Sequence, residues 1–233
     1  MPDQKPFFQL RNIRKAYRTG TVETTALADI DLDIREGEFV SVMGPSGCGK
    51  STLLNIVAML DTPTSGRYVL GGVEVSTASE AQLADIRKGN IGFIFQNFML
   101  IDDLSVYENV ELPLRCLNVP RLQRQARVRE VLELVDLQPR AKHRPMQLSG
   151  GQQQRVAIAR AVVGDPKLIV ADEPTGNLDS RHGEEVMDML TTLHQQGTTI
   201  LMVTHSHAHA GRADRILTML DGRLVSDTAR AAA

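Results

Sequence analysis

The sequence predicts an α/β fold built around a phosphate-binding loop, and three observations lead to that prediction. Residues 44–52 read GPSGCGKST, which fits the pattern G-x-x-x-x-G-K-[ST]. Apolar, β-prone residues 39–43 precede this loop, and helix-like residues 52–58 follow it. Farther along, residues 168–173 form an apolar strand that ends in an Asp-Glu pair. Such segments are typical of a sheet with ligand-binding residues beyond the carboxyl ends of its strands.

The glycine-rich loop can bind phosphate through its backbone. The N–H groups of Gly47, Gly49 and Lys50 can surround phosphate oxygens, and the following helix adds the positive end of its dipole. Lys50 would reach the β- and γ-phosphates, and the hydroxyl of Ser51 would bind Mg²⁺. The alternative is a flexible turn that matches by chance, which the flanking strand and helix disfavour. The residues that we expect to bind nucleotide here are Gly44, Pro45, Ser46, Gly47, Cys48, Gly49, Lys50, Ser51 and Thr52.

Composition limits the class of protein. A chain of 233 residues with 42% hydrophobic residues can bury a large core. Its net charge of −2 gives no electrostatic footprint for nucleic acid, so we expect no nucleic-acid partner. Two cysteines are too few for a disulfide framework and indicate a reducing compartment. We see no signal peptide at the N-terminus and no apolar run long enough to cross a membrane. If the protein works at a membrane, another chain must cross it.

Most of the remaining chain alternates between strands and helices. We expect strands at residues 7–17, 91–95, 167–171, 198–203 and 215–220, and one or two strands within 23–34. A hairpin is expected at 68–75, and residues 223–226 should close a final hairpin. Helices are expected at 80–88, 105–116, 121–137, 151–163 and 180–195. The last residues, 229–233, are expected to fray. One apolar helix face is marked by Leu122, Val128, Val131, Leu132 and Val135.

This pattern predicts one domain that covers residues 1–233. Residues 1–96 and 164–233 would form the α/β core together with a β-rich part. Residues 97–163 would form a helical insertion.

The Asp-Glu pair at the end of the apolar strand suggests metal and water chemistry. In a phosphate-loop enzyme, the first carboxylate at such a strand end holds Mg²⁺, which assigns that role to Asp172. Glu173 would then be placed to orient or deprotonate an attacking water. A solvated carboxylate pair is the alternative, and the phosphate loop upstream favours the chemical interpretation.

A second glycine-rich stretch opens a helix. Residues 148–152 read LSGGQ and precede the helix-like residues 153–160, which makes a further anion site. At this point the sequence resembles the ATP-binding cassette (ABC) family, because LSGGQ is identical to the family's signature motif. Residues 44–51 and 168–173 match its two Walker motifs. Further matches are Gln96 to the Q-loop glutamine, residues 177–179 to the D-loop, His205 to the switch histidine and Tyr17 to an aromatic that stacks on adenine.

The resemblance implies an ABC nucleotide-binding domain: a phosphate-loop ATPase core with an N-terminal antiparallel β subdomain and an inserted α-helical subdomain. It implies ATP hydrolysis with Mg²⁺, in which two cassettes clamp two ATP molecules head to tail. Each ATP would lie between one chain's Walker loop and the signature loop of its partner. The implied residues are Glu173, His205 and Gln96 for catalysis, Ser51, Gln96 and Asp172 for Mg²⁺, and Ser149, Gly150, Gly151 and Gln152 for the partner's nucleotide.

Four short stretches are more specific and resemble the lipoprotein-release, macrolide-export and cell-division branch of the family: residues 96–98, 108–114, 152–155 and 174–179. The resemblance implies a second ATPase subunit, as a homodimer, and a separate permease at the cytoplasmic face of a bacterial inner membrane. An apolar cluster follows the Q-loop and either receives a permease helix or packs within the helical insertion; it comprises Phe98, Met99, Leu100, Ile101, Leu104 and Tyr107.

Two other classes compete with the transporter interpretation. Soluble relatives in DNA repair or translation carry long coiled coils, zinc cysteines or a second cassette, none of which we find in this sequence. A regulatory scaffold that binds ATP without turnover would not need Glu173 and His205.

Two local features have simpler explanations. His205, His207 and His209 resemble a metal-binding run, but only the first and last share a helix face, so we favour surface residues that open a helix. Cys48 stands where relatives often carry serine, beside a helix N-terminus and Lys50. Because both favour a thiolate, we expect Cys48 to react faster than Cys116, which lies in an apolar helical stretch.

Overall fold

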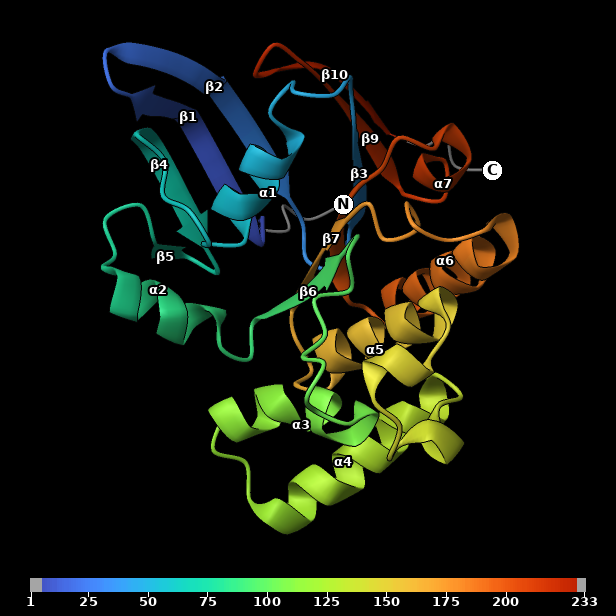
Figure 1. Cartoon of the computed structure of the whole chain (residues 1–233). Helices are drawn as coiled ribbons and strands as arrows, with labels where there is room; N and C mark the ends of the chain where they lie inside the picture. Colours follow the sequence, from blue (N-terminus) through green and yellow to red (C-terminus); the bar gives the residue numbers. More distant parts are fainter. Residues whose placement is uncertain (1–5, 230–233) are drawn as a thin grey trace. The chain divides into compact units, whose positions relative to one another are not determined.

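The computed structural model describes residues 6–229 and divides into two compact units (Figure 1). The first unit contains the described residues up to Arg87 and those from Thr199 onward. The second unit is Lys88–Thr198. The expectations about a signal peptide and about fraying of the C-terminal tail concern mainly residues 1–5 and 230–233, which lie outside the described residues.

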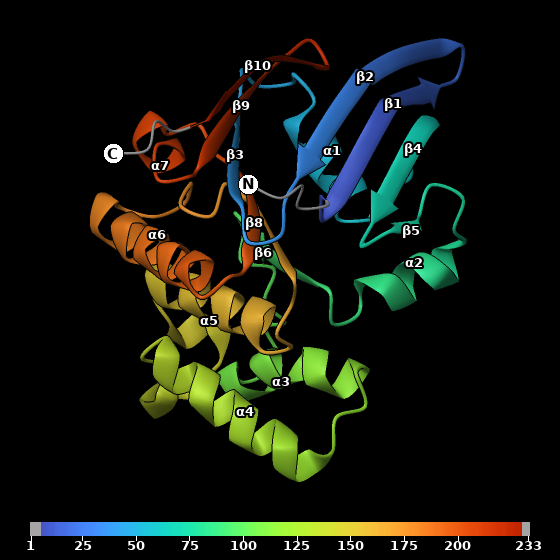
Figure 2. The same ribbon diagram turned by 180° about the vertical axis from the view of Figure 1, so that it is seen from behind.

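An antiparallel sheet occupies part of the first unit, in the order β2-β1-β4-β5 (Figure 2). Its strands are β1 (Phe8–Thr19), β2 (Val22–Ile34), β4 (Ser65–Leu70) and β5 (Val73–Glu74). Thr19 pairs with Val22 across a two-residue turn, in which Gly20 takes a φ of +62°. The segment 23–34, for which one or two strands were expected, is therefore part of one long strand, β2. This sheet is the antiparallel β subdomain that the resemblance implies.

The first unit also contains the strand that leads into the phosphate loop. This strand, β3 (Phe39–Met43), pairs in parallel with β8 (Thr199–Val203) and with β9 (Arg215–Leu220), and β10 (Arg223–Ala229) is antiparallel to β9. All residues of β3 and β8 are buried, as expected for parallel strands covered on both faces. The helices of this unit are α1 (Lys50–Val57), α2 (Glu80–Arg87) and α7 (His207–Ala210).

The second unit combines a parallel strand pair with helices. The strands are β6 (Ile91–Phe95) and β7 (Leu168–Asp172), and the helices are α3 (Val106–Cys116), α4 (Arg121–Leu134), α5 (Gly150–Val162) and α6 (Ser180–Gln195). Two 3₁₀ turns, η1 (Gln138–Arg140) and η2 (Pro145–Gln147), lie between α4 and α5. Helix α5 contacts α3, α4, α6 and β6, so the helix that begins within the LSGGQ stretch is the centre of this unit (Figure 1).

One expected core residue of α4 is not in the core. Val128, Val131 and Leu132 are buried, but the Leu122 side chain is 80% exposed. Six residues at 100° each place Leu122 about 120° around the helix from Val128. The prediction for Leu122 was therefore wrong, because its position points away from the face that contacts α3 and α5.

Among residues 6–229, no helix is both long enough and apolar enough to cross a membrane.

Candidate functional site

The phosphate loop joins the end of β3 to the start of α1. Gly44 and Gly49 have φ values of +151° and +104°, which residues other than glycine rarely adopt. A Cβ atom on Gly49 would lie 2.5 Å from the carbonyl oxygen of Ala26, so this glycine also permits a close backbone approach. Local conformation and packing therefore both require glycine at position 49, directly before the helix begins.

Lys50 closes this loop on itself. Its side chain is buried, and Nζ donates hydrogen bonds to the carbonyl oxygens of Gly44, at 2.9 Å, and Pro45, at 2.8 Å. An ammonium group is costly to bury without acceptors, and these two carbonyls reduce that cost. The arrangement holds a positive charge inside a loop of glycine N–H groups. Ser51, which is exposed, and Thr52, which is half-buried, follow in the first turn of α1.

The structure contradicts the expected order of cysteine reactivity. Cys48 is only 4% exposed, and its Sγ atom lies 4.0 Å from Nζ of Lys50. Cys116 is exposed at the last position of α3. The α3 residues that face the core include Val110 and Leu114, and Cys116 lies off that face. A buried thiol is protected from reagents whatever its charge, so Cys116 is the accessible cysteine.

His205 leaves the sheet beside the phosphate loop. Val42 of β3 pairs with Val203 of β8, and the N–H of Thr204 donates to the carbonyl of Val42 at 3.2 Å. The two strands thus end at the same edge, and exposed His205 comes two residues after the end of β8. Helix α7 begins at His207, as expected for surface residues that open a helix. The described residues contain no cluster of three His, Cys, Asp or Glu side chains that could hold a metal ion.

Tyr17 lies near the end of β1 and is 42% exposed. Its hydroxyl donates a hydrogen bond to Asp61 at 2.9 Å, and Lys15 Nζ lies 5.0 Å from the ring centroid. Lys15 also donates to the carboxylate of Asp61 at 2.5 Å. Burial, together with the hydrogen bond to Asp61, raises the pKa of Tyr17. These contacts hold the tyrosine ring in place and leave part of it accessible.

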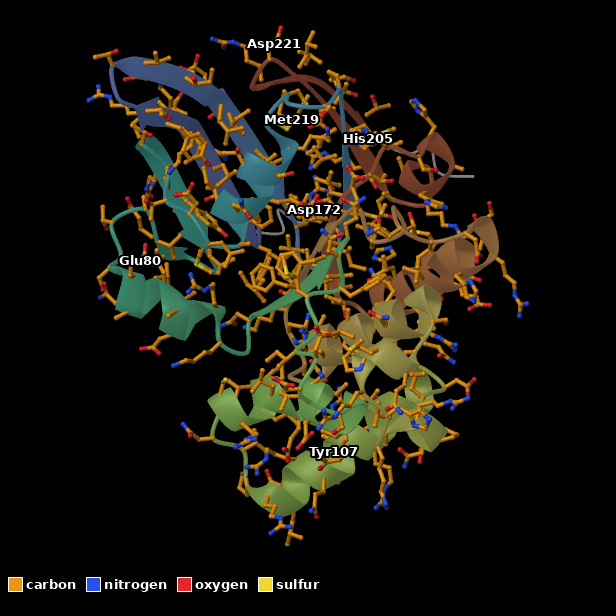
Figure 3. The ribbon with its side chains drawn as sticks, viewed as in Figure 1. Glu80, Tyr107, Asp172, His205, Met219 and Asp221 are labelled. Carbon is orange, nitrogen blue, oxygen red and sulfur yellow. The ribbon has the colours of Figure 1, made fainter. Side chains whose placement is uncertain are left out.

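In the second unit, three predicted site residues meet at one sheet edge. Phe95 pairs with Asp172 at the ends of β6 and β7, so Gln96 and Glu173 follow at the same level. Figure 3 labels Asp172 at this end of β7. Glu173 takes a left-handed φ of +45°, which residues other than glycine adopt uncommonly, so the backbone changes direction directly after the strand. The turn is closed by a hydrogen bond from the N–H of Gly176 to the Glu173 carbonyl at 3.0 Å.

The signature loop is the N-terminus of α5. Ser149 is exposed, and its hydroxyl accepts a hydrogen bond from the N–H of Gln152 at 3.3 Å. The Gln152 side chain accepts in return from the N–H of Ser149 at 3.1 Å, which completes a capping box. The Ser149 hydroxyl uses a lone pair in this cap, so its proton remains available to an incoming anion.

Two residues support these loops in a way that the sequence did not predict, although both lie in stretches that resemble the family. Gln154 of α5 is completely buried and donates a hydrogen bond to the carbonyl of Pro174 at 2.7 Å, which connects the signature helix to the turn after Glu173. Asn177 donates to the Gln96 carbonyl at 3.1 Å and to the Asn97 side chain at 2.8 Å. The glutamine run at 152–154 was the only signal for Gln154, and nothing in the sequence indicates its partner.

The segment after Gln96 is held by two further residues. Arg160 of α5 donates to the carbonyls of Phe98, at 2.8 Å, and Met99, and both of these residues have positive φ values. Buried Asn109 accepts from the N–H of Ile101 at 2.9 Å and donates to the carbonyl of the same residue at 3.1 Å. Met99 and Ile101 are 58% and 43% exposed, so part of the apolar cluster faces outward and is not internal packing.

Comparison with known proteins identifies the family. A family model described as "ABC transporter" matches residues 27–176. The chain belongs to the ABC transporter family. The resemblance that the motifs predicted is confirmed, and so are the fold class and the assignment as an ABC ATPase.

Among its relatives is the "Uncharacterized ABC transporter ATP-binding protein YknY" of Bacillus subtilis, which is 50% identical over 93% of this chain and 94% of the relative. The "Macrolide export ATP-binding/permease protein MacB" of Brucella melitensis is 48% identical over 97% of this chain. This ABC ATPase spans only 35% of that MacB protein. A solved dimeric structure of the ATP-binding cassette MJ0796, described as a post-hydrolysis state bound to ADP and Pi, aligns at 43% identity with a TM-score of 0.90, over 97% of this chain and all of the other.

Proposed function

We propose that this ABC ATPase hydrolyses ATP at sites shared between two copies and thereby powers a separate membrane permease of the macrolide-export or lipoprotein-release type. The observation that carries this proposal is the presence of two glycine-rich helix N-termini, at Lys50 of α1 and at Ser149 of α5. Each can bind phosphate, and the relative MJ0796 was solved as a dimer bound to ADP and Pi.

In this proposal the phosphate loop binds the nucleotide within one chain. Lys50 moves its hydrogen bonds from the carbonyls of Gly44 and Pro45 to the β- and γ-phosphates. The exposed ring of Tyr17 stacks on adenine, and His205 contacts the γ-phosphate from the neighbouring strand end. Glu173 accepts a proton from the attacking water, because its carboxylate follows directly on the strand end that carries Asp172.

Three of the predicted site residues carry oxygen donors that suit Mg²⁺. Ser51, Gln96 and Asp172 supply a hydroxyl, an amide carbonyl and a carboxylate, which are the hard oxygen ligands that this ion prefers. The ion would neutralise charge on the β- and γ-phosphates. Asn177 supports Gln96 by donating a hydrogen bond to the Gln96 carbonyl. Gly176 leaves space for the Gln96 side chain, because a Cβ atom at position 176 would lie 2.7 Å from Nε2 of Gln96.

The signature loop completes the site of the other copy. The Ser149 hydroxyl and the N–H groups at the start of α5 would contact the γ-phosphate bound by the partner's phosphate loop, so ATP draws the two chains together. Hydrolysis then removes the link and the dimer opens. In the same composite arrangement, the two glycine-rich helix N-termini of one chain would serve two different nucleotides of the dimer.

The permease would dock on the segment around Phe98–Tyr107. Met99 and Ile101 expose apolar side chains there, and Arg160 and Asn109 hold the backbone in a defined conformation. The MacB relative is named an ATP-binding/permease protein and is much longer than this chain, which supports a permease as the partner of this chain. Such a partner would place this ATPase at the cytoplasmic face of a bacterial inner membrane.

A mixing experiment tests the shared site. Lys50→Ala removes nucleotide binding from its own chain, and Ser149→Arg places a bulky cation where the partner's nucleotide would lie. Each variant alone should be inactive, and an equal mixture should recover a measurable fraction of wild-type ATPase activity because one composite site is intact. Ser105→Arg is the matched control: Ser105 caps α3 with the same type of capping box but lies outside the signature loop.

Recovery on mixing, with Ser105→Arg close to wild type, would support the head-to-tail arrangement. Mixed dimers that form without any recovery would contradict it. Capture of the wild-type chain with a permease from detergent-solubilised membranes would test the second half of the proposal.

A further inference from the structure

His182 fills the space beside the second glycine of the signature loop. If Gly151 carried a Cβ atom, that atom would lie 2.6 Å from Cδ2 and 2.7 Å from Cγ of the His182 ring. Contacts this short do not occur between real side chains, so an alanine at position 151 would force the ring to move. His182 lies in the first turn of α6, and Gly151 lies in the first turn of α5.

Backbone conformation gives no reason for a glycine at this position. Gly151 lies within helix α5 and is not among the glycines with positive φ. Its neighbour Gly150 provides a comparison, since a Cβ there would meet Phe98 and Leu178 only at ordinary distances of 3.7 Å and 3.8 Å. The space occupied by His182 is therefore the structural reason within this chain for glycine at position 151.

The other side of the His182 ring is held by Asp179. Nδ1 lies 2.7 Å from one carboxylate oxygen, and the His182 backbone N–H donates to the other at 3.0 Å. These bonds lower the pKa of Asp179, so the carboxylate accepts and Nδ1 carries the proton. One imidazole thus connects the cap residue of α6 to the first turn of α5.

We propose that His182 is a positioning residue for ATP turnover. It fixes the position of Asp179 relative to the signature loop, so that Asp179 and the signature loop move together. Two helix N-termini, those of α5 and α6, are thereby held in one arrangement before any phosphate arrives. This inference rests on the proposed composite site, in which α5 contacts the γ-phosphate of the partner. The phosphate loop itself takes no part in it.

The first experiment separates the hydrogen bond from the bulk of the ring. His182→Ala should lower kcat about 10-fold or more, because a hydrogen bond to a charged group is lost, whereas ATP binding to the monomer should stay within about 2-fold. His182→Asn should retain most of the activity, since its Nδ2–H can replace Nδ1–H toward Asp179. Arg181→Ala is the control at the adjacent, exposed position and should match wild type.

The second experiment is a double-mutant cycle. Gly151→Ala should lower kcat at least about 10-fold by displacing the ring. In the His182→Ala background the same change should cost much less, because the ring is absent and only the Cβ atom of residue 182, at 3.1 Å, remains close to the new methyl group. Gly150→Ala should show no such dependence on His182, because a Cβ at position 150 would not reach that ring.

Wild-type kcat in His182→Ala would overturn the proposal, and so would a double variant as poor as the product of the two single effects. The thermal unfolding temperature of each variant shows whether the loss of activity comes from a loss of stability. A general loss of stability would not predict rescue by His182→Asn. If the wild-type chain shows neither ATPase activity nor recovery in the mixing experiment, the proposed function fails first. If both are present and His182→Ala is normal, only this inference fails.

Discussion

Phe95 and Asp172 lie opposite each other in the parallel pair of β6 and β7, each at the last position of its strand. This register sets where the predicted site residues of the second unit lie. Gln96 and Glu173 follow at the same edge, and the left-handed backbone of Glu173 turns the chain sharply after the strand. Asn177 then bonds back to the carbonyl of Gln96, so the two loops form one supported edge.

The first prediction concerns this edge. Glu173→Gln keeps the size and polarity of the side chain but cannot accept a proton. Phosphate release should fall by at least ~10²-fold while ATP binding persists, and ATP-bound dimers should accumulate on a sizing column. Glu133→Gln, at an exposed position of α4, is the control and should behave as wild type. Near-normal turnover in Glu173→Gln would show that another group activates the water.

The second prediction compares two glycines of the phosphate loop. Gly49→Ala should reduce the free energy of unfolding by about 2–4 kcal/mol, because its Cβ would overlap the Ala26 carbonyl and its φ is positive. Gly47→Ala meets nothing within 4 Å and should cost only the backbone strain, about 1–2 kcal/mol. Urea unfolding of the two variants measures the difference. Equal losses would mean that the contact with Ala26 relaxes freely.

The third prediction uses the two cysteines. A maleimide should label Cys116 first, because it is exposed, and this should leave ATPase activity intact. Cys48 should be labelled slowly, with loss of activity, and the rate should fall further when Mg-ATP covers the loop. Labelling sites are read by mass spectrometry of peptides over time. Faster modification of Cys48 than of Cys116 would show that the phosphate loop opens readily.

The fourth prediction is a pH dependence. Hydrogen bonds from the Arg215 guanidinium lower the pKa of Asp227 below its ordinary value near 3.8. A carboxylate with a depressed folded-state pKa stabilises the fold above its unfolded pKa, and this contribution is lost as the pH falls through the folded pKa. Asp227→Asn should therefore be less stable than wild type at pH 7, by at most about 1 kcal/mol because the side chain is half-exposed.

The difference should shrink below about pH 4 and vanish once Asp227 is protonated in the folded protein as well. Urea unfolding at pH 7 and at about pH 3 measures it. A difference that is constant across this range would mean that Asp227 contributes through packing, not through its charge.

Local sequence predicted most of the secondary structure, because the signals that define each element lie within it. Strands β6 and β9 and helix α6 begin and end where their patterns predicted. The apolar run 168–171 of β7 and the glycine-rich run before Lys50 also predict their structure locally, since period, caps and positive-φ positions are properties of neighbouring residues. The family motifs are local in the same sense, which explains why they could be read from one chain.

Contacts between distant segments were decided only by the tertiary structure. Cys48 is buried in the phosphate loop, where the N–H of the distant residue Gly222 donates a hydrogen bond to its carbonyl at 3.0 Å. Leu122 is exposed because α4 turns that position away from α5. The bonds from Arg160 to the carbonyls of Phe98 and Met99, and the fit of His182 against Gly151, join residues that are roughly 30 to 60 positions apart in the chain. No periodicity encodes such pairs, because burial and hydrogen-bond geometry depend on which other element arrives at the same place.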